Sequence, residues 1–295
     1  MLDFKSFTGQ AMVDLRPLLD LQKFRTCDYT VGGLYMWREY FRQQYAVSGG
    51  MLICSAEYLD KGTCFSVPVG YGDAEKALSE LSDHCRSMGI PLRFCCVTND
   101  GLEILRNNLG EPSEIIEYRD WADYLYPYEN FLGYRGKKLV TPRNHVNRFI
   151  REFPQYEYRV LDESMIPEAK DFIIRNEQIF DKDSALSKED FIRSVEVLDH
   201  FEEFGFTGGL LTVDNNTIGL SVGEAVGDTL YVHIEKAIRS YSGAYPMLAS
   251  LYAKQNADSR LLYINREDDS GDEGLRHSKL GYHPCEIIMK YVVSY

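Results

Sequence analysis

Hydrophobic positions follow two spacings along the first half of the chain, and each spacing predicts a type of element. Behind Asp73, apolar side chains recur every three to four positions up to Gly89, which predicts a capped amphipathic helix. Helical spacing also appears at 15–41 and at 99–105. The short apolar runs that predict buried strands lie at 51–56, 64–69, 92–97 and 113–118. The predicted order is αα-β-β-α-β-α-β.

The second half repeats this alternation more clearly. Predicted strands lie at 156–161, 206–213, 218–226, 229–237, 261–265 and 286–293. Predicted helices lie at 142–153, 167–178, 188–203, 245–255 and 272–280. A meander of three antiparallel strands followed by a helix that crosses to a parallel strand is the order of GNAT (N-acyltransferase-type) domains. We therefore predict an α/β (α+β) chain of two tandem GNAT-like domains, residues 1–125 and 126–295, each a mixed sheet flanked by helices.

Composition and charge narrow the range of partners. The chain has 295 residues, 44% hydrophobic, and a formal net charge of −13, which argues against a general polyanion-coating protein. It has no apolar run long enough for a transmembrane helix and no secretory signal pattern. Seven cysteines without a CxxC pair indicate reduced thiols and a cytoplasmic protein, with no metal site expected. Nothing in the sequence indicates an oligomeric state.

A basic segment stands out against this acidic background. Residues 135–151 carry six arginines and lysines and no acidic residue. On a helix, Arg143, Asn144, Asn147 and Arg148 fall on an arc beside an apolar stripe. Guanidinium and amide donors on one face suit phosphate oxygens, from a tRNA backbone or a phosphorylated small molecule. The alternative is a solvated helix face that joins two acidic domains.

The strand and turn at 229–245 carry candidate chemistry. Alternation places His233 and Glu235 on one face, where Glu235 could position or deprotonate an amine and His233 could be a base. Either side chain could equally be structural. The following turn has only Gly243-Ala244 in place of the glycine-rich phosphate loop of GNAT enzymes. No cofactor is therefore predicted, although a coenzyme A thioester stays an alternative.

The end of the chain supplies further polar candidates. Asn265 and Arg266 follow a predicted parallel strand, at the end where open α/β sheets bind ligands. Arg276 and Lys279 lie three residues apart on the next helix and could hold a phosphate or form ion pairs. Tyr282 follows that helix, where a GNAT tyrosine can protonate a leaving thiolate.

Several segments resemble one known family: 123–126 with 136–138 and 143–147, 233–237 with 242–245, and 264–269 with 271–276 and 279–284. Over about residues 15–295 the chain resembles the family named for the C-terminal catalytic domain of phosphatidylglycerol lysyltransferases. The resemblance implies two fused GNAT units, much as in Fem-type peptidoglycan aminoacyl transferases, and a donor such as aminoacyl-tRNA. The membrane-embedded half of the full lysyltransferase is not in this sequence, so we expect the soluble stand-alone branch.

The preferred function is acyl transfer of GNAT type, with an aminoacyl group from aminoacyl-tRNA or an acyl group from a thioester passing to an amine or hydroxyl acceptor. The alternative is a non-catalytic ligand- or phosphate-binding module that kept the fold. The expected catalytic residues are Glu235, His233 and Tyr282. The expected substrate- or phosphate-binding residues are Arg143, Asn144, Asn147, Arg148, Lys236, Gly243, Ala244, Tyr245, Asn265, Arg266, Arg276 and Lys279.

Overall fold

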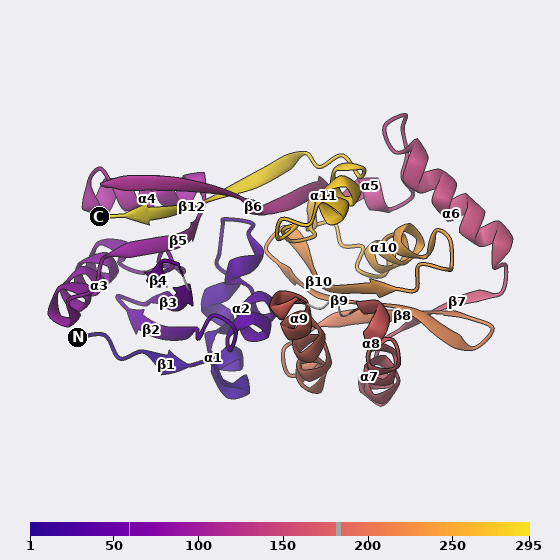
Figure 1. Cartoon of the computed structure of the whole chain (residues 1–295), viewed down its shortest axis with the longest axis horizontal. Helices are drawn as coiled ribbons and strands as arrows, with labels where there is room; N and C mark the ends of the chain where they lie inside the picture. Colours follow the sequence, from indigo (N-terminus) through magenta and orange to yellow (C-terminus); the bar gives the residue numbers. More distant parts are fainter. Residues whose placement is uncertain (59, 181–183) are drawn as a thin grey trace. The chain divides into compact units, whose positions relative to one another are not determined.

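The computed structural model describes residues 1–58, 60–180 and 184–295, which form two compact units (Figure 1). Unit 1 comprises Met1–Asp123, Asp268–Gly271 and Ile287–Tyr295, and unit 2 comprises Tyr124–Glu267 and Asp272–Glu286. The sequence placed the division after residue 125 and the closing strand in the second domain. In the structure that strand belongs with unit 1, because its register partners lie on a strand near residue 95.

Unit 1 is a mixed sheet with the strand order β1-β2-β3-β4-β5-β12. Its strands are β1 (Lys5–Ser6), β2 (Gln44–Ser48), β3 (Met51–Tyr58), β4 (Gly62–Phe65), β5 (Arg93–Val97), the first part of β6 (Glu114–Pro127) and most of β12 (Glu286–Ser294). Its helices are α1 (Gly9–Leu19), the 3-10 turn η1 (Cys27–Tyr29), α2 (Val31–Trp37), α3 (Ala74–Met88) and α4 (Asn99–Leu109). Strands β4 and β5 pair in parallel, whereas β1–β2, β2–β3, β3–β4 and β5–β12 pair antiparallel.

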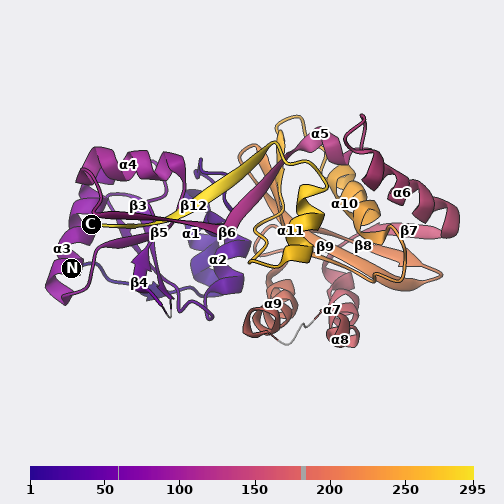
Figure 2. The ribbon, with the colours of Figure 1, turned by 45° about the horizontal axis from the view of Figure 1, so that its top comes forward.

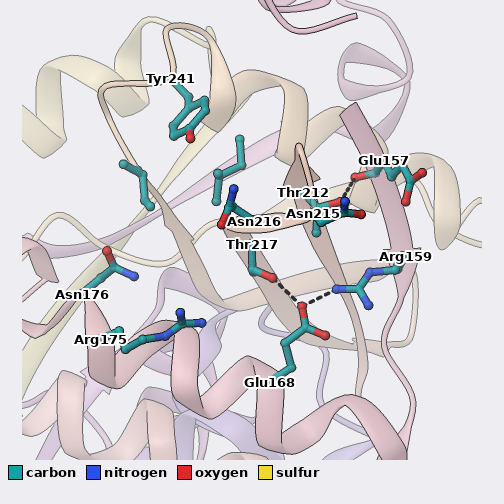
Figure 3. A pocket seen from close by; sticks show the side chains of 12 residues that line it. Glu157, Arg159, Glu168, Arg175, Asn176, Thr212, Asn215, Asn216, Thr217 and Tyr241 are labelled. Atoms are coloured by element: carbon teal, nitrogen blue, oxygen red, sulfur yellow. Dashed lines mark hydrogen bonds and ion pairs between the residues drawn. The ribbon is translucent and has the colours of Figure 1, made fainter. Parts of the chain in front are cut away.

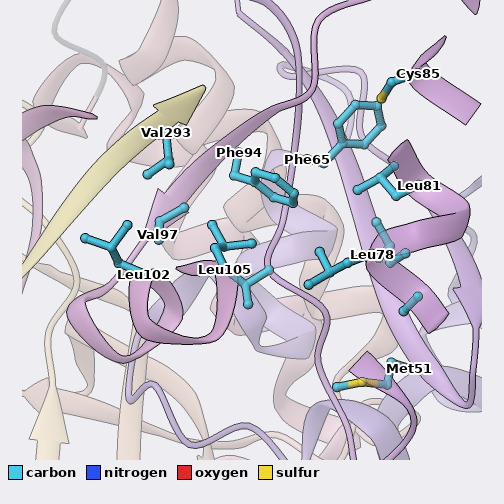
Figure 4. Close-up of a cluster of buried hydrophobic side chains, with 13 residues drawn as sticks. Met51, Phe65, Leu78, Leu81, Cys85, Phe94, Val97, Leu102, Leu105 and Val293 are labelled. Atoms are coloured by element: carbon cyan, nitrogen blue, oxygen red, sulfur yellow. The ribbon is translucent and has the colours of Figure 1, made fainter. Parts of the chain in front are cut away.

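Helix α3 forms as its sequence predicts and closes the core of unit 1. The Asp73 side chain accepts a hydrogen bond from the Lys76 amide, and Gly89 ends the helix with φ of 67°. The apolar stripe of the helix packs on the sheet, where Phe65 and Phe94 are fully buried (Figure 4). Burial of this stripe is what makes the helix stable.

The first forty residues differ from the predicted helix pattern. The stretch at 15–41 is divided among α1, η1 and α2, and Thr30 caps α2 by accepting from the Gly33 amide. Strands β1 and β2 were not predicted. Only two of the five residues of β2 are buried, and β1 is exposed throughout, so neither has a strong hydrophobic signal.

Unit 2 is a mixed sheet with the order β6-β11-β10-β9-β8-β7. Its strands are β7 (Tyr156–Val160), β8 (Thr207–Val213), β9 (Asn216–Val226), β10 (Thr229–Ala237), β11 (Tyr263–Asn265) and the end of β6. Its helices are α5 (Tyr128–Phe131), α6 (Val140–Glu152), α7 (Ile166–Arg175), α8 (Glu177–Phe180), α9 (Ala185–Glu196), α10 (Ala244–Gln255) and α11 (Glu273–Leu280), with 3-10 turns η2 (Glu163–Met165) and η3 (Val197–His200). Helix α10 covers one face of the sheet, and α7 and α9 cover the other (Figures 1 and 2).

The order of elements in unit 2 confirms the prediction of a GNAT-like fold. Strands β8, β9 and β10 form the antiparallel meander, α10 crosses to β11, and β11 lies parallel to β10. The chain is a tandem of two GNAT-like units, each a mixed sheet flanked by helices. Across the parts of the chain that the structure describes, no helix has both the length and the apolar character needed to span a bilayer.

Candidate active site

Strands β10 and β11 run in parallel for three residue pairs and then separate. Thr229–Tyr231 pair with Tyr263–Asn265, where β11 ends, while β10 continues to Ala237. On its other side β10 pairs with β9, and the register shifts by one residue at His233. A bulge of this kind changes the direction of the side chains that follow it. Open α/β sheets bind ligands where parallel strands separate, so this divergence is the candidate active site.

His233 lies between two carboxylates at this point. Its Nδ1 is 2.8 Å from Glu267 Oε1, its Nε2 is 3.0 Å from Glu224 Oε1, and its side chain is only 1% exposed. Burial lowers the pKa of His233, but the hydrogen bonds and charges of the two glutamates outweigh burial and raise the pKa to about 9. The imidazole is therefore protonated at neutral pH. In that state it donates to both carboxylates and holds Glu267 in place.

Glu267 was not among the residues singled out in the sequence. Its backbone is left-handed, with φ of 58°, and its amide donates to Asn265 Oδ1 at 2.6 Å. Its side chain is 25% exposed, against 10% for Glu235 and 0% for Glu224. Non-glycine residues held in this conformation concentrate at functional sites. In the sequence Glu267 is the first of three acidic residues that follow Arg266, and nothing in the sequence distinguishes it from the other two.

Glu235, for which the sequence left both a catalytic and a structural role open, forms an ion pair with Arg266. Its Oε1 accepts from Arg266 Nη2 at 2.5 Å, and both side chains are nearly buried. The Arg266 guanidinium lies 4.6 Å from the centre of the Tyr282 ring, which in turn stacks on Phe131 at 5.6 Å. Burial raises the pKa of Tyr282 to about 12, although Arg266 lowers it in part. The Tyr282 phenol is thus protonated at neutral pH and can donate.

One hydrogen-bond donor in this cluster is unsatisfied. Arg266 Nη1 is buried and has no hydrogen-bond partner among the residues that the structure describes. Tyr126 and Tyr134, which are also buried here, donate their hydroxyl hydrogens to Lys279 O and Pro246 O. A buried N–H of a guanidinium without an acceptor is costly. The oxygen of a bound molecule would satisfy it.

The other predicted residues of this region have identified contacts. Lys236 Nζ lies 2.5 Å from Asp190 Oδ2 of α9. Lys279 Nζ donates to Arg266 O at 2.6 Å, which fixes the end of β11. Arg276 is half-buried on α11, where its amide donates to Asp272 O. The divergence thus brings together His233, Glu235, Asn265, Arg266, Lys279 and Tyr282.

The turn before α10 is shaped by helix packing. Gly243 has φ of 88°, and a Cβ at this position would lie 2.2 Å from His145 O of α6. Glycine is therefore required for the close approach of α6, whatever ligand binds nearby. Ala244 begins α10 and is buried, and Tyr245 is half-buried. Ala244 N already donates to Tyr241 O and Pro246 has no N–H, so the Tyr245 amide remains the candidate phosphate contact at this turn.

Helix α6 buries Pro142 and Phe149 and presents a basic, amide-bearing surface. Arg143 Nη1 donates to the backbone carbonyls Tyr134 O (3.0 Å) and Gly136 O (3.1 Å), so it stabilises the preceding turn. Arg148 pairs with Glu152 at 2.7 Å. The exposed polar members of this surface are Arg135, Lys137, Lys138, Asn144, Asn147, Arg148 and Arg151. The structure therefore separates Arg143 from the more accessible cations.

A compact charge cluster in unit 1 has the ligand types of a metal site. Cys27, Asp28 and Asp123 bring a thiol and two carboxylates within 4.8 Å of one another. Lys290 Nζ lies 2.6 Å from Asp28 Oδ2 and 2.7 Å from Asp123 Oδ1, and its side chain is 1% exposed. The ammonium therefore already supplies the positive charge that the two carboxylates need.

Comparisons with known proteins agree with this fold. A conserved protein of unknown function from Bacteroides thetaiotaomicron has the same fold with a TM-score of 0.90 and 29% identity, over 100% of this chain and 99% of that one. The C-terminal domain of a proposed lysylphosphatidylglycerol synthetase from Agrobacterium fabrum matches with a TM-score of 0.64 and 13% identity, over 97% and 92% of the two chains. FemX matches with a TM-score of 0.55 and 12% identity, over 98% and 96%.

A sequence relative is less fully covered. An uncharacterised protein of Mycoplasmoides gallisepticum is 25% identical over 175 residues, which are 59% of this chain and 56% of that protein. The match therefore spans little more than half of the relative's length.

The fold and the strand divergence define the chain as a tandem GNAT-like protein. The family model for the phosphatidylglycerol lysyltransferase C-terminal domain matches residues 20–294. The chain belongs to that family.

Proposed function

We propose that unit 2 is a transferase that moves an aminoacyl group from aminoacyl-tRNA, or an acyl group from a thioester, to an amine or hydroxyl acceptor. The observation that carries the proposal is the divergence of β10 and β11 beside the carboxylate of Glu267, whose side chain is 25% exposed. The family's name describes transfer of a lysyl group, which is the same class of chemistry. The GNAT-like fold also favours acyl transfer by analogy.

In the proposed reaction with an amine, Glu267 removes the proton from the acceptor nitrogen. The nitrogen attacks the ester carbonyl of the donor, the new C–N bond forms, and the ester C–O bond breaks. The unsatisfied Arg266 Nη1 donor stabilises the negative charge that develops on the carbonyl oxygen. Tyr282, protonated at neutral pH, donates a proton to the leaving oxygen. Glu235 acts by orienting Arg266.

The donor would bind through phosphate contacts at the two helices α6 and α10. Exposed Lys137, Lys138 and Arg151 supply positive charge on the α6 side. At the N-terminus of α10 the amide of Tyr245 is the candidate contact, because Ala244 N already donates to Tyr241 O and Pro246 has no N–H. GNAT enzymes hold the pyrophosphate of coenzyme A in a glycine-rich loop, but this turn has a single glycine, Gly243, and that glycine packs against α6. Aminoacyl-tRNA is therefore favoured over coenzyme A as the donor.

A binding module without catalysis is the second candidate. It is favoured by the internal pairing of the charged residues of β10, Glu235 with Arg266 and Lys236 with Asp190. Groups that are already neutralised by each other are less available for chemistry. In this case the site would bind the same donors without turnover.

Thermal stability against a ligand panel tests the proposal. The panel is coenzyme A, acetyl-coenzyme A, deacylated tRNA and charged tRNAs, each at a concentration well above the protein. A ligand that binds only the folded state raises Tm by mass action. A rise with charged tRNA and none with coenzyme A supports aminoacyl transfer. A rise with the thioester alone indicates an ordinary acyltransferase, and no rise with either donor contradicts the transferase proposal.

A further inference from the structure

A cavity of about 660 Å³ opens on unit 2 at the end of the sheet where β10 finishes. Its walls come from β7, α7, the turn between β8 and β9, and the segment after β10 (Figure 3). Figure 3 shows Arg175 and Asn176 on one side, Arg159 and Glu157 on the other, and Tyr241 above. The volume falls within the range of small-molecule sites. None of its lining residues belongs to the group at the strand divergence.

Three charged residues of this cavity, Arg159, Glu168 and Arg175, already form ion pairs within the protein. Glu168 accepts hydrogen bonds from Arg159 and Thr217. Burial raises the pKa of Glu168, but these two contacts outweigh burial and lower the pKa below its usual value, so the carboxylate is ionised. Arg175 pairs with Asp171 on the same helix at 2.6 Å. An ion bound here would have to compete with an existing ion pair.

Apart from Glu157, the rest of the wall is uncharged and rich in hydrogen-bonding groups. It consists of the side chains of Asn176, Thr212, Asn215, Asn216, Thr217 and Tyr241, with Ile218 and Ile238. Amides and hydroxyls offer both donors and acceptors. The Tyr241 ring and the two isoleucines add an apolar surface. Asn215 reaches the cavity from the turn between β8 and β9, where its φ is 63°.

We propose that this cavity is a binding site for a neutral polyhydroxylated ligand, a disaccharide. Hydroxyls that both donate and accept match the mixed amides and hydroxyls of the wall, and the C–H face of a sugar ring matches Tyr241. A phosphate is disfavoured because Glu157 and Glu168 face the same space as the two arginines. The site is independent of the proposed transferase site, with which it shares no residue.

The test is isothermal titration calorimetry of the full chain with maltose, cellobiose and lactose, and with glycylglycine and inorganic phosphate as charged probes. The binding variants are Asn215→Gly, which removes the amide at a position where glycine tolerates the positive φ, and Tyr241→Leu, which removes the ring. Loss of a hydrogen bond or a ring contact is expected to weaken binding about fivefold or more. The matched control is Arg86→Gln, which removes an exposed paired arginine of α3 in unit 1.

Saturable binding of at least one disaccharide, weakened in both cavity variants and unchanged in Arg86→Gln, supports the site. Saccharide binding that the cavity variants leave unchanged, or binding of the charged probes alone, would overturn it, as would no binding of any sugar. The circular dichroism spectrum of each variant confirms that it is folded. Because the cavity and the strand divergence have no residue in common, either proposal can fail while the other holds.

Discussion

His233 Nδ1 lies 2.8 Å from Glu267 Oε1, and this contact joins the bulge of β10 to the left-handed residue that follows β11. The imidazole also contacts Glu224, so one cation is shared by two carboxylates. The carboxylate at the protein surface is therefore oriented by a buried cation. In the proposed mechanism His233 therefore positions Glu267, and Glu267 has the role of base.

This arrangement predicts a stability change with pH. The folded pKa of His233 is about 9, above the ordinary value of about 6.5 in the unfolded chain. The stabilisation is therefore complete below pH 6.5 and is lost as the pH rises through 9, and its size is on the order of 3 kcal/mol. Urea unfolding at pH 6, 7.5 and 9.5 measures it. His233→Gln should remove this part of the pH dependence, whereas His277→Gln, at an exposed position on α11, should keep it.

Glu267 and Glu235 are expected to respond differently to substitution. Glu267→Gln should lower the transfer rate constant by a factor of about 10²–10⁴, because it removes the proposed base. Glu235→Gln removes the charge that orients Arg266, so it should raise the KM for the donor and also lower kcat. Steady-state kinetics of the two variants separates these effects. Equal activity of Glu267→Gln and the wild type would rule out Glu267 as the base.

Gly243→Ala should destabilise unit 2 by about 2–4 kcal/mol, since the added methyl group combines a positive φ with overlap on His145 O. Gly136→Ala is the matched control. Its φ is 93°, but nothing lies within 4 Å of the added Cβ, so it should cost only about 1 kcal/mol. Denaturant unfolding of both variants measures the difference. Similar losses in the two would show that the contact between α6 and Gly243 is not tight.

The accessible cations beside and on α6 are expected to set the salt dependence of tRNA binding. The double substitution Lys137→Ala, Lys138→Ala should weaken binding and reduce the slope of log affinity against log salt by about 1–2. Arg143→Ala should act chiefly through stability, because its guanidinium holds two backbone carbonyls. Lys76→Ala on α3 of unit 1 is the control for loss of charge. An unchanged slope in the double variant would remove this surface from the donor site.

Lys290→Met should destabilise unit 1 by about 3–5 kcal/mol, because it leaves two carboxylates close together in a buried place. Adding Asp123→Asn should restore part of the lost free energy of unfolding, because it removes one of the two carboxylates that no longer have a positive partner. Chemical denaturation of the single and double variants measures the recovery. A double variant that is less stable than Lys290→Met alone would contradict the charge argument.

In this chain the sequence predicts the bounds of helices and strands better than it predicts which strands pair in the sheet. Periodicity and caps place α3 and β10 within a residue or two, because Asp73, Gly89 and the alternation of 229–237 act over a few residues. Helix α10 begins one residue earlier than predicted. The pairing of β12 with β5 could not be predicted in the same way, because the two strands lie nearly two hundred residues apart in the sequence and their pairing depends on long-range packing.

The same limit applies to the candidate site. The sequence identified His233, Glu235, Arg266 and Tyr282 from strand ends and family motifs, and the structure brings them together. It did not identify Glu224 and Glu267, because their role depends on a bulge and on a positive φ that no local pattern announces.

The most direct test of the central proposal is a single-turnover assay with tRNAs that carry labelled amino acids. The label is followed as it leaves the tRNA ester and enters an amide or ester of an added acceptor, with wild type and Glu267→Gln compared. The transferase account predicts enzyme-dependent formation of the new bond, at least about 100-fold slower in Glu267→Gln. Binding of charged tRNA without any transfer by the wild type, across amine and hydroxyl acceptors, would contradict it.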